Sequence, residues 1–180
     1  MKNIAVIVLM LVSFNGLAQF KSANLQAAGL TCALCSRSIN KSLEKLSFIQ
    51  SVTPDIKSSS FSIVFKPGAT VQIDEMKQAV EDAGFSVAKL KITGAFKSVK
   101  VQNDAHVTID GRVFHFINTS NQTLEGDRTI TLADKDFVSA KEFKKLSTGS
   151  KLSCVQTGKA GSCCTKEGIQ ANTRIYHVTI

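Results

Sequence analysis

The chain has few tryptophan and tyrosine side chains of the kind that stack on nucleic-acid bases. It contains no tryptophan and one tyrosine among its 180 residues, and its basic excess, formally +8, is spread along the sequence. Proteins that bind nucleic acids usually gather Arg and Lys on one face, together with aromatic side chains that stack on bases. The composition therefore argues against a nucleic-acid partner.

Long apolar runs are also absent after the first residues. Met1-Lys2-Asn3 is followed by an apolar run from Ile4 to Val12, and Gly16-Leu17-Ala18 places small residues where signal peptidase cleaves. The run is shorter than the roughly 20 residues of a membrane-spanning helix. We therefore expect a signal peptide at residues 1–18, no membrane span, and an exported, periplasmic chain that starts near Gln19. No cysteine lies at the cleavage point, which argues against a lipid anchor.

Cysteine is the most informative residue type in this sequence. Five cysteines in an exported chain is an odd number, so disulfides within one chain cannot pair all of them. Two of them form Cys32-Ala33-Leu34-Cys35, a loop too short to restrain the unfolded chain much if it were bridged. Thiolates are soft donors that prefer Cu(I) or Zn(II) to Mg or Ca, and the start of a helix favours the thiolate form. The pair therefore indicates a site for a soft metal.

The hydrophobic period between residues 21 and 92 changes in a definite order. Apolar residues alternate from Ala23 to Ala27 and from Phe61 to Phe65, which predicts strands, and residues 49–56 and 87–92 add two more. Helical spacing follows Cys35 and recurs from Ile73 to Ala83, where Gly84 closes the second helix. The predicted order is βαββαβ.

At two places this region resembles the heavy-metal-associated domain family, which includes copper chaperones and periplasmic mercury-binding proteins. Gly29-Leu30-Thr31-Cys32-Ala33-Leu34-Cys35 resembles the Gly-Met-Thr-Cys-x-x-Cys loop of the family, and Glu81-Asp82-Ala83-Gly84-Phe85 resembles the end of its second helix. Leu30 replaces the usual Met, a volume-conserving change that removes no ligand. The resemblance implies a ferredoxin-like fold over residues 19–92.

The resemblance also implies what the site does. Cys32 and Cys35 would hold the metal in an exposed loop with few other ligands, and Phe85 would shield it from the neighbouring loop. Such an open site lets a partner's thiolate enter, whereas closed four-ligand sites hold structural zinc. Cu(I) is the expected ion, with Hg(II), Zn(II) and Cd(II) as alternatives. The expected partner is a metal-transporting membrane protein or another thiol-rich acceptor.

Other interpretations of the Cys32–Cys35 pair stay open. It could be a plain disulfide or an inert buried pair, the redox centre of a thiol oxidoreductase or sensor, or a vestigial site in an interaction module. Against a thioredoxin-like protein, the chain lacks the longer doubly wound pattern.

Basic residues recur every four positions on the first predicted helix, at Arg37, Lys41 and Lys45. They form either a solvated helix face or a docking face for an acidic partner.

The pattern becomes strand-rich after Thr93-Gly94, where we expect a boundary, and residues 93–180 predict a small β-rich domain with one helix. Short strands are expected at 96–101, 107–109, 113–117, 129–132, 151–156 and 173–180, and Asp110-Gly111 is a two-residue hairpin turn. Ser139 and Glu142 form a capping box at the start of the helix. This order fits a barrel of the oligonucleotide-binding type or a compact α+β sheet. The whole chain is therefore assigned to the α+β class.

Three cysteines of this second region, Cys154, Cys163 and Cys164, bracket a Gly-Lys-Ala-Gly loop. Cys154 could form a disulfide with Cys163 or Cys164, all three could form a second soft-metal site, perhaps with a histidine, or Cys163 and Cys164 could form a strained, redox-labile bridge. The three histidines, His106, His115 and His177, have no zinc-motif spacing, and none is chosen as a ligand.

Taken together, the sequence predicts an exported metal chaperone or scavenger and not an enzyme. Its primary metal ligands are Cys32 and Cys35, and the alternative function is thiol–disulfide redox chemistry at the same pair.

Overall fold

The computed structural model describes residues 18–30 and 33–180 of the chain. The expected signal peptide lies outside the described residues except for Ala18, and Cys32 lies outside them as well. The first half of the chain contains β1 (Ala18–Ala28), α1 (Ala33–Glu44), β2 (Ile49–Asp55), β3 (Ser60–Phe65), α2 (Ile73–Asp82) and β4 (Ser86–Val101). The second half contains β5 (Ala105–Ile109), β6 (Arg112–Phe116), β7 (Gln122–Leu132), α3 (Ala140–Ser147), α4 (Cys154–Thr157), α5 (Ser162–Thr165) and β8 (Ile175–Thr179).

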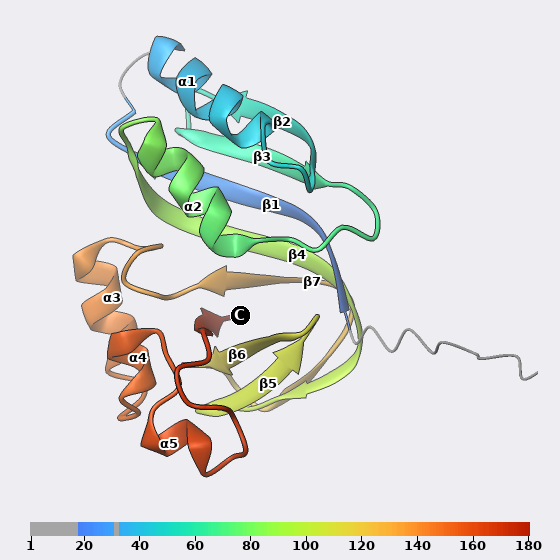
Figure 1. Ribbon diagram of the computed structural model, residues 1–180, viewed down its shortest axis with the longest axis vertical. Helices are drawn as coiled ribbons and strands as arrows, with labels where there is room; N and C mark the ends of the chain where they lie inside the picture. The colour runs from blue at the N-terminus through green and yellow to red at the C-terminus, as the bar shows by residue number, and fades with distance from the viewer. Residues whose placement is uncertain (1–17, 31–32) are drawn as a thin grey trace, which may run out of the picture.

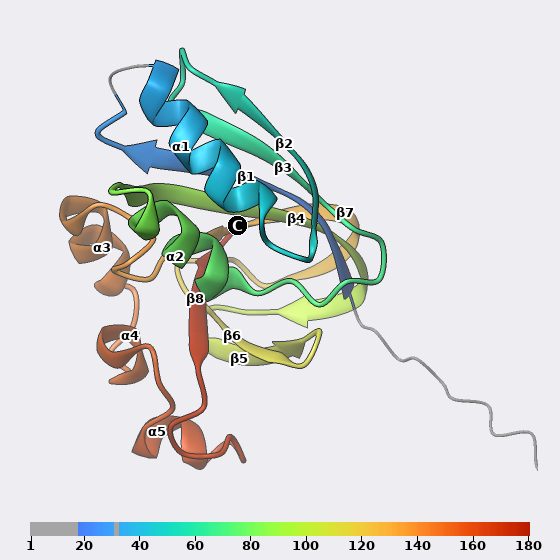
Figure 2. The same cartoon turned by 45° about the horizontal axis from the view of Figure 1, so that its top comes forward.

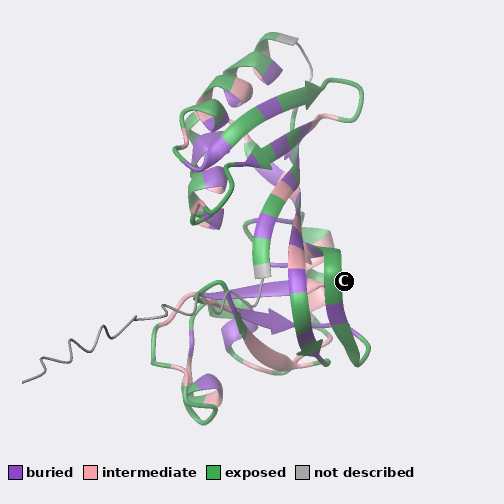
Figure 3. Cartoon of the chain, turned by 90° about the vertical axis from the view of Figure 1, so that its right-hand side faces the viewer, coloured by how far each residue is buried: buried purple, intermediate pink, exposed green. Residues whose placement is uncertain are grey.

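The first half has the predicted ferredoxin-like arrangement. Its strands lie in the order β2-β3-β1-β4, and each pairs antiparallel with its neighbours. Helices α1 and α2 lie side by side over one face of these strands (Figure 1). Buried and exposed residues alternate along β3, as expected for a sheet with one covered face (Figure 3).

The two helices bury the residues that set their predicted period. Ile39 and Leu43 of α1 are fully buried, as are Ile73 and Val80 of α2. After α2 the chain turns at Gly84, whose φ of +87° lies in the left-handed region that glycine adopts without strain. The prediction that Gly84 closes this helix is therefore confirmed.

Strand β4 is longer than the sequence pattern predicts. The expected separate strands at 87–92 and 96–101 are one strand, which pairs with β1 on one side and β7 on the other. Gly94 suggested a break, but the glycine instead allows a close approach, because a Cβ there would lie 3.0 Å from the Gln19 carbonyl oxygen. The domain boundary predicted at residues 92/93 falls inside this shared strand, and the division into two domains stays a prediction.

The second half extends the same sheet instead of closing a barrel. The full order is β2-β3-β1-β4-β7-β8-β6-β5, so β2 and β5 are its edges, and the expected barrel of the oligonucleotide-binding type is not found. Strand β8 runs parallel to β6 and antiparallel to β7. Helices α3, α4 and α5 follow one another along one side of this half (Figures 1 and 2).

Two local predictions for this half are confirmed and one is wrong. Asp110 and Gly111 both have positive φ, as a tight hairpin turn requires, and Ser139 accepts a hydrogen bond from the backbone N–H of Glu142. Part of the expected strand at 151–156 is helical instead, because α4 begins at Cys154. Gly158, with φ +67°, caps the end of this helix. A short apolar run does not distinguish a strand from a single helical turn.

Arg174 connects the two halves through polar contacts. Its guanidinium donates to both carboxylate oxygens of Asp74 on α2, at 3.2 Å each, and to the buried Asp134 at 3.4 Å. The Tyr176 hydroxyl donates to Asp74 at 2.9 Å, and Asp134 accepts from the backbone N–H and Nδ1 of His177 at 3.1 and 2.7 Å. These bonds fix α2 against the strands of the second half.

None of the helices in the described part of the chain has the length and apolar character needed to cross a membrane.

We predict that Arg174→Ala lowers the free energy of unfolding by about 2 kcal/mol, because it leaves the buried Asp134 carboxylate without a cation. Urea denaturation measures this loss. Arg128→Ala, at an exposed position of β7, is the control and is expected to change stability by less than about 0.5 kcal/mol. Equal midpoints for the two variants would contradict the structural role of Arg174.

Candidate functional site

The predicted primary site lies where β1 leads into α1. Gly29 ends β1 with a φ of +77°, and Leu30 is half-buried against the hydrophobic core. Cys35 lies in the first turn of α1 and is also half-buried. Leu34, beside it, is 77% exposed, the largest exposed fraction among the exposed large apolar residues Leu34, Ile56, Val64 and Ile180. Because Cys32 lies outside the described residues, the distance between the two sulfurs stays a prediction.

The surroundings of this loop agree with the sequence pattern where they are described. Phe85, which follows the turn after α2, is half-buried and packs against the core. The basic residues Arg37 and Lys41 are exposed on α1, and Lys45 is exposed directly after its last residue. Their role, as a solvated face or a docking face, stays open.

A second candidate site lies on the β5–β6–β8 part of the sheet. His106 on β5 pairs in register with His115 on β6, and His115 pairs with His177 on β8. The rings of His106 and His115 stack with their centres 4.4 Å apart, and His177 meets His115 edge-on at 5.1 Å. Three histidines far apart in the sequence therefore form one row across three strands.

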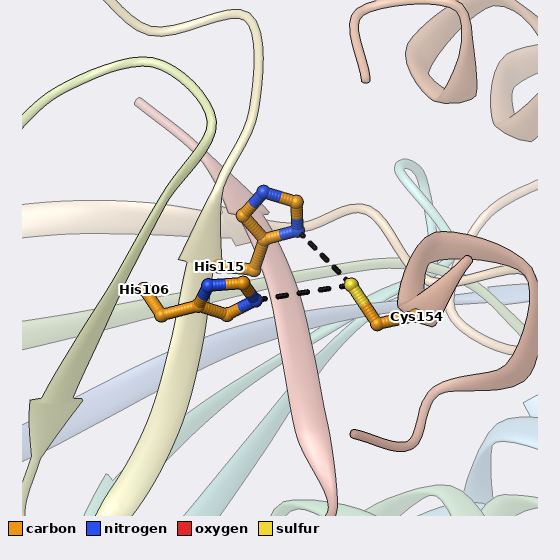
Figure 4. A group of neighbouring side chains, drawn as sticks. All are labelled: His106, His115 and Cys154. Carbon is orange, nitrogen blue, oxygen red and sulfur yellow. Dashed lines mark hydrogen bonds between the residues drawn. The ribbon is translucent and has the colours of Figure 1, made fainter. Parts of the chain in front are cut away.

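Two of these histidines face the thiols of α4 and α5. The Cys154 sulfur lies 3.8 Å from His106 Nε2 and 3.7 Å from His115 Nδ1 (Figure 4). The Cys164 sulfur lies 3.6 Å from the same His106 Nε2. His177 is not part of this group: its Nδ1 contacts Asp134, and its buried Nε2 has no hydrogen-bond partner among the described residues.

The three C-terminal cysteines are close together and not cross-linked. Cys154, Cys163 and Cys164 all carry free thiols, and their sulfurs lie within 4.8 Å of one another. The Cys163 and Cys164 sulfurs are 3.4 Å apart. The structure therefore describes the reduced cysteines. Which of them would form a disulfide in an oxidised chain stays a prediction.

The three thiols have different pKa values because their surroundings differ. Burial, followed by hydrogen bonding with Cys164, raises the pKa of Cys154, and burial also raises the pKa of Cys164. At Cys163 burial acts in the same direction, but hydrogen bonds from the Ser153 hydroxyl, Cys164 and nearby backbone N–H groups outweigh it. They lower the pKa of Cys163 to about 7. At neutral pH Cys163 is thus the thiol that is readily ionised.

Chemically, the cluster offers ligands for a metal ion. Two sets of three side chains have ligand atoms within 4.8 Å of one another: His106, His115 and Cys154, and then Cys154, Cys163 and Cys164. The cysteines were expected from the sequence, but His106 and His115 were not chosen. A signal for them existed, because a two-residue turn at Asp110-Gly111 places His106 directly opposite His115.

We predict that iodoacetamide alkylates Cys163 in the native, reduced, metal-free protein with a rate that rises with pH and is half-maximal near pH 7. The reason is that the thiolate is the nucleophile and its fraction increases as pH passes the pKa. Ser153→Ala removes one stabilising hydrogen bond and should move the midpoint upward.

Peptide mapping by mass spectrometry measures each cysteine separately. The buried Cys154 and Cys164 are the internal controls and should react far more slowly. Alkylation of Cys154 at the rate of Cys163 would contradict the described burial.

Comparisons with known proteins concern the first half of the chain. The heavy-metal-associated domain family matches residues 25–86. The cation-transporting ATPase HMA5 of Oryza sativa subsp. japonica is 30% identical over 96 residues, which are 53% of this chain and 10% of the relative. The copper-transporting ATPase HMA5 of the same organism is 33% identical over 70 residues, which are 39% of this chain and 7% of the relative. The chain thus spans a tenth or less of the length of these relatives.

Among solved structures, the CopZ metallochaperone is 22% identical, with a TM-score of 0.35, and the match covers 37% of this chain and 98% of that chain. A copper-binding domain from HMA7, a P-type ATPase, is 27% identical, with a TM-score of 0.34, and the match covers 37% of this chain and 89% of that chain. The match to the family model confirms the predicted family of the N-terminal region: residues 25–86 of this chain are a heavy-metal-associated domain.

Proposed function

We propose that this chain is an exported metal chaperone or scavenger that binds Cu(I) through Cys32 and Cys35 and is not an enzyme. The observation that carries the proposal is the heavy-metal-associated domain at residues 25–86, with its Cys-x-x-Cys loop at the start of α1. Soft thiolate ligands select Cu(I) and similar ions. The relatives whose printed names mention a metal are copper-transporting ATPases, which supports copper as the first ion to test.

The described residues near the loop support transfer to a partner. Leu34 presents a large apolar side chain to solvent beside Cys35, and Arg37 and Lys41 continue along the exposed face of α1. An apolar contact surrounded by positive charge suits a docking partner with an acidic surface. The partner we propose is a metal-transporting membrane protein or another thiol-rich acceptor.

Export is the second part of the proposal. Cleavage after Ala18 would leave Gln19 and Phe20 in strand β1, where they pair with Ala95 and Gly94 of β4. Phe20 is buried and meets the ring of Phe114 edge-on at 5.9 Å. A mature chain that starts at Gln19 would therefore keep its first residues packed in the sheet. We propose the periplasm as its location.

We predict that replacing Cys32 and Cys35 together with serine lowers the number of tightly bound Cu(I) ions by one per chain. An anaerobic titration against a chromogenic Cu(I) chelator, with reductant present, measures the stoichiometry. Ser38→Ala, at an exposed position of α1, is the control, because it changes the same helix without removing a thiol.

Unchanged Cu(I) stoichiometry in the double variant would exclude the proposed site. The unsubstituted chain serves to test the redox alternative, by measurement of the reduction potential of the Cys32–Cys35 pair. Catalysed thiol–disulfide exchange without Cu(I) binding would favour the oxidoreductase. Absence of both activities would favour an interaction module.

A further inference from the structure

The β5–β6 hairpin and the helices α4 and α5 bring four ligand atoms to one point. His106 Nε2 lies 3.8 Å from the Cys154 sulfur and 3.6 Å from the Cys164 sulfur, and His115 Nδ1 lies 3.7 Å from the Cys154 sulfur. Around a tetrahedral zinc ion, with Zn–S near 2.3 Å and Zn–N near 2.0–2.1 Å, a sulfur ligand and a nitrogen ligand lie roughly 3.6 Å apart. The three observed sulfur–nitrogen separations are therefore close to three of the six edges of such a tetrahedron.

Carboxylates orient both imidazoles toward the thiols. His106 Nδ1 lies 2.9 Å from Glu167 Oε2, and His115 Nε2 lies 2.9 Å from Asp104 Oδ1. Because an ionised carboxylate can only accept, each of these ring nitrogens carries the hydrogen and donates it. The opposite nitrogen of each neutral ring then presents a lone pair to the sulfurs. Carboxylate–histidine pairs of this kind are typical of metal sites in proteins.

The four side chains of the cluster, two histidines and two cysteines, are buried. The side chains of His106 and His115 are 3% and 0% exposed, and Cys154 and Cys164 are fully buried. His115 Nδ1, the ring nitrogen opposite the one that is hydrogen-bonded to Asp104, lies 3.7 Å from the Cys154 sulfur and is placed to coordinate. Cys163 is only half-buried, and its sulfur faces Ser153 and Cys164 at the edge of the group.

We infer that His106, His115, Cys154 and Cys164 form a closed Cys₂His₂ site for a tetrahedral d¹⁰ ion, with Zn(II) as the ion that this ligand set favours. Binding displaces one proton from each of the two thiols, releases both to solvent, and involves no change of oxidation state. The site does not depend on Cys32 and Cys35, so it is separate from the function proposed above.

A resident ion would fasten the small helices to the sheet. Cys154 is the first residue of α4, and Cys164 lies in the middle of α5, whereas the two histidines lie on β5 and β6. Each helix has only four residues, so neither is stable without tertiary contacts. A four-ligand, buried site holds its ion, in contrast to an exposed two-cysteine loop, which allows exchange.

The first experiment uses the full chain carrying Cys32→Ser and Cys35→Ser, reduced and freed of metal with a chelator. Titration with Co(II) should give a tetrahedral visible spectrum with thiolate charge-transfer bands at one ion per chain, and one equivalent of Zn(II) should abolish it. Failure to bind Co(II) and Zn(II) would overturn the inference without affecting the proposal for Cys32 and Cys35.

Adjacent cysteines supply a matched pair of variants in this background. Cys164→Ser should weaken Zn(II) binding by at least about tenfold and reduce the charge-transfer bands, whereas Cys163→Ser should leave both nearly unchanged. If Cys163→Ser removes the ion as effectively as Cys164→Ser, the site uses all three thiols and the Cys₂His₂ assignment is wrong. A site that takes Cu(I) but rejects Zn(II) would likewise overturn the assignment.

Substitution of the carboxylates that orient the two imidazoles tests the role of the histidines without changing a buried residue. Glu167→Gln should lower Zn(II) affinity by roughly 10–100-fold, because the His106 ring loses its charged partner. Asp104→Asn should act similarly at His115, and asparagine tolerates the φ of +61° at this position. Glu125→Gln, at an exposed position of β7, is the control. Equal Zn(II) affinities for all three variants would contradict the orienting role that the inference gives to Glu167 and Asp104.

Discussion

Strand β4 makes backbone hydrogen bonds to β1 along one side and to β7 along the other, and this double pairing connects the two halves of the molecule. Without it, the heavy-metal-associated domain and the C-terminal region would each end in an unpaired strand edge. The close approach of β1 at Gly94 and the Asp74–Arg174–Asp134 contacts reinforce the connection. One consequence is that the elements around both candidate metal sites pack on a single continuous sheet.

The two sites differ in the physical features that control how a metal ion is held. In the proposed function Cys32 and Cys35, at the start of α1 beside the exposed Leu34, would hold an ion with two thiolates and leave coordination positions for an incoming ligand. The C-terminal cluster instead has two imidazoles and two thiols, all buried, with carboxylates behind the rings. The first arrangement suits exchange with a partner, and the second suits retention. A chain with both could deliver one ion while another stabilises its fold.

The sequence predicts the first half of the fold well because its helices and strands are long enough to show their periods. Helices α1 and α2 bury Ile39, Leu43, Ile73 and Val80 at the expected spacing, and the family motif fixes the loop between β1 and α1. Gly94 misled the prediction of β4, because a glycine can mark either a break or a close backbone approach. Only the neighbouring strand decides between the two.

The second half was harder to predict for a different reason. Helices α4 and α5 are single turns, too short to produce a helical period, and contacts among Cys154, Val155, Cys164 and Ile175 position them. His106 and His115 are nine positions apart in the sequence, a spacing that matches no zinc motif, yet the turn at Asp110-Gly111 makes them neighbours. The hairpin register could therefore have predicted that the two histidines are neighbours. That the thiols lie next to them depends on tertiary packing, which the sequence pattern does not show.

Anomalous X-ray diffraction from crystals of the reduced full chain, grown with Cu(I) and Zn(II) and measured at both absorption edges, tests the account most directly. We expect a copper peak at the loop between β1 and α1, bound by Cys32 and Cys35. We also expect a zinc peak among His106, His115, Cys154 and Cys164. Electron density for a Cys32–Cys35 disulfide, with no anomalous peak in either place, would contradict the account.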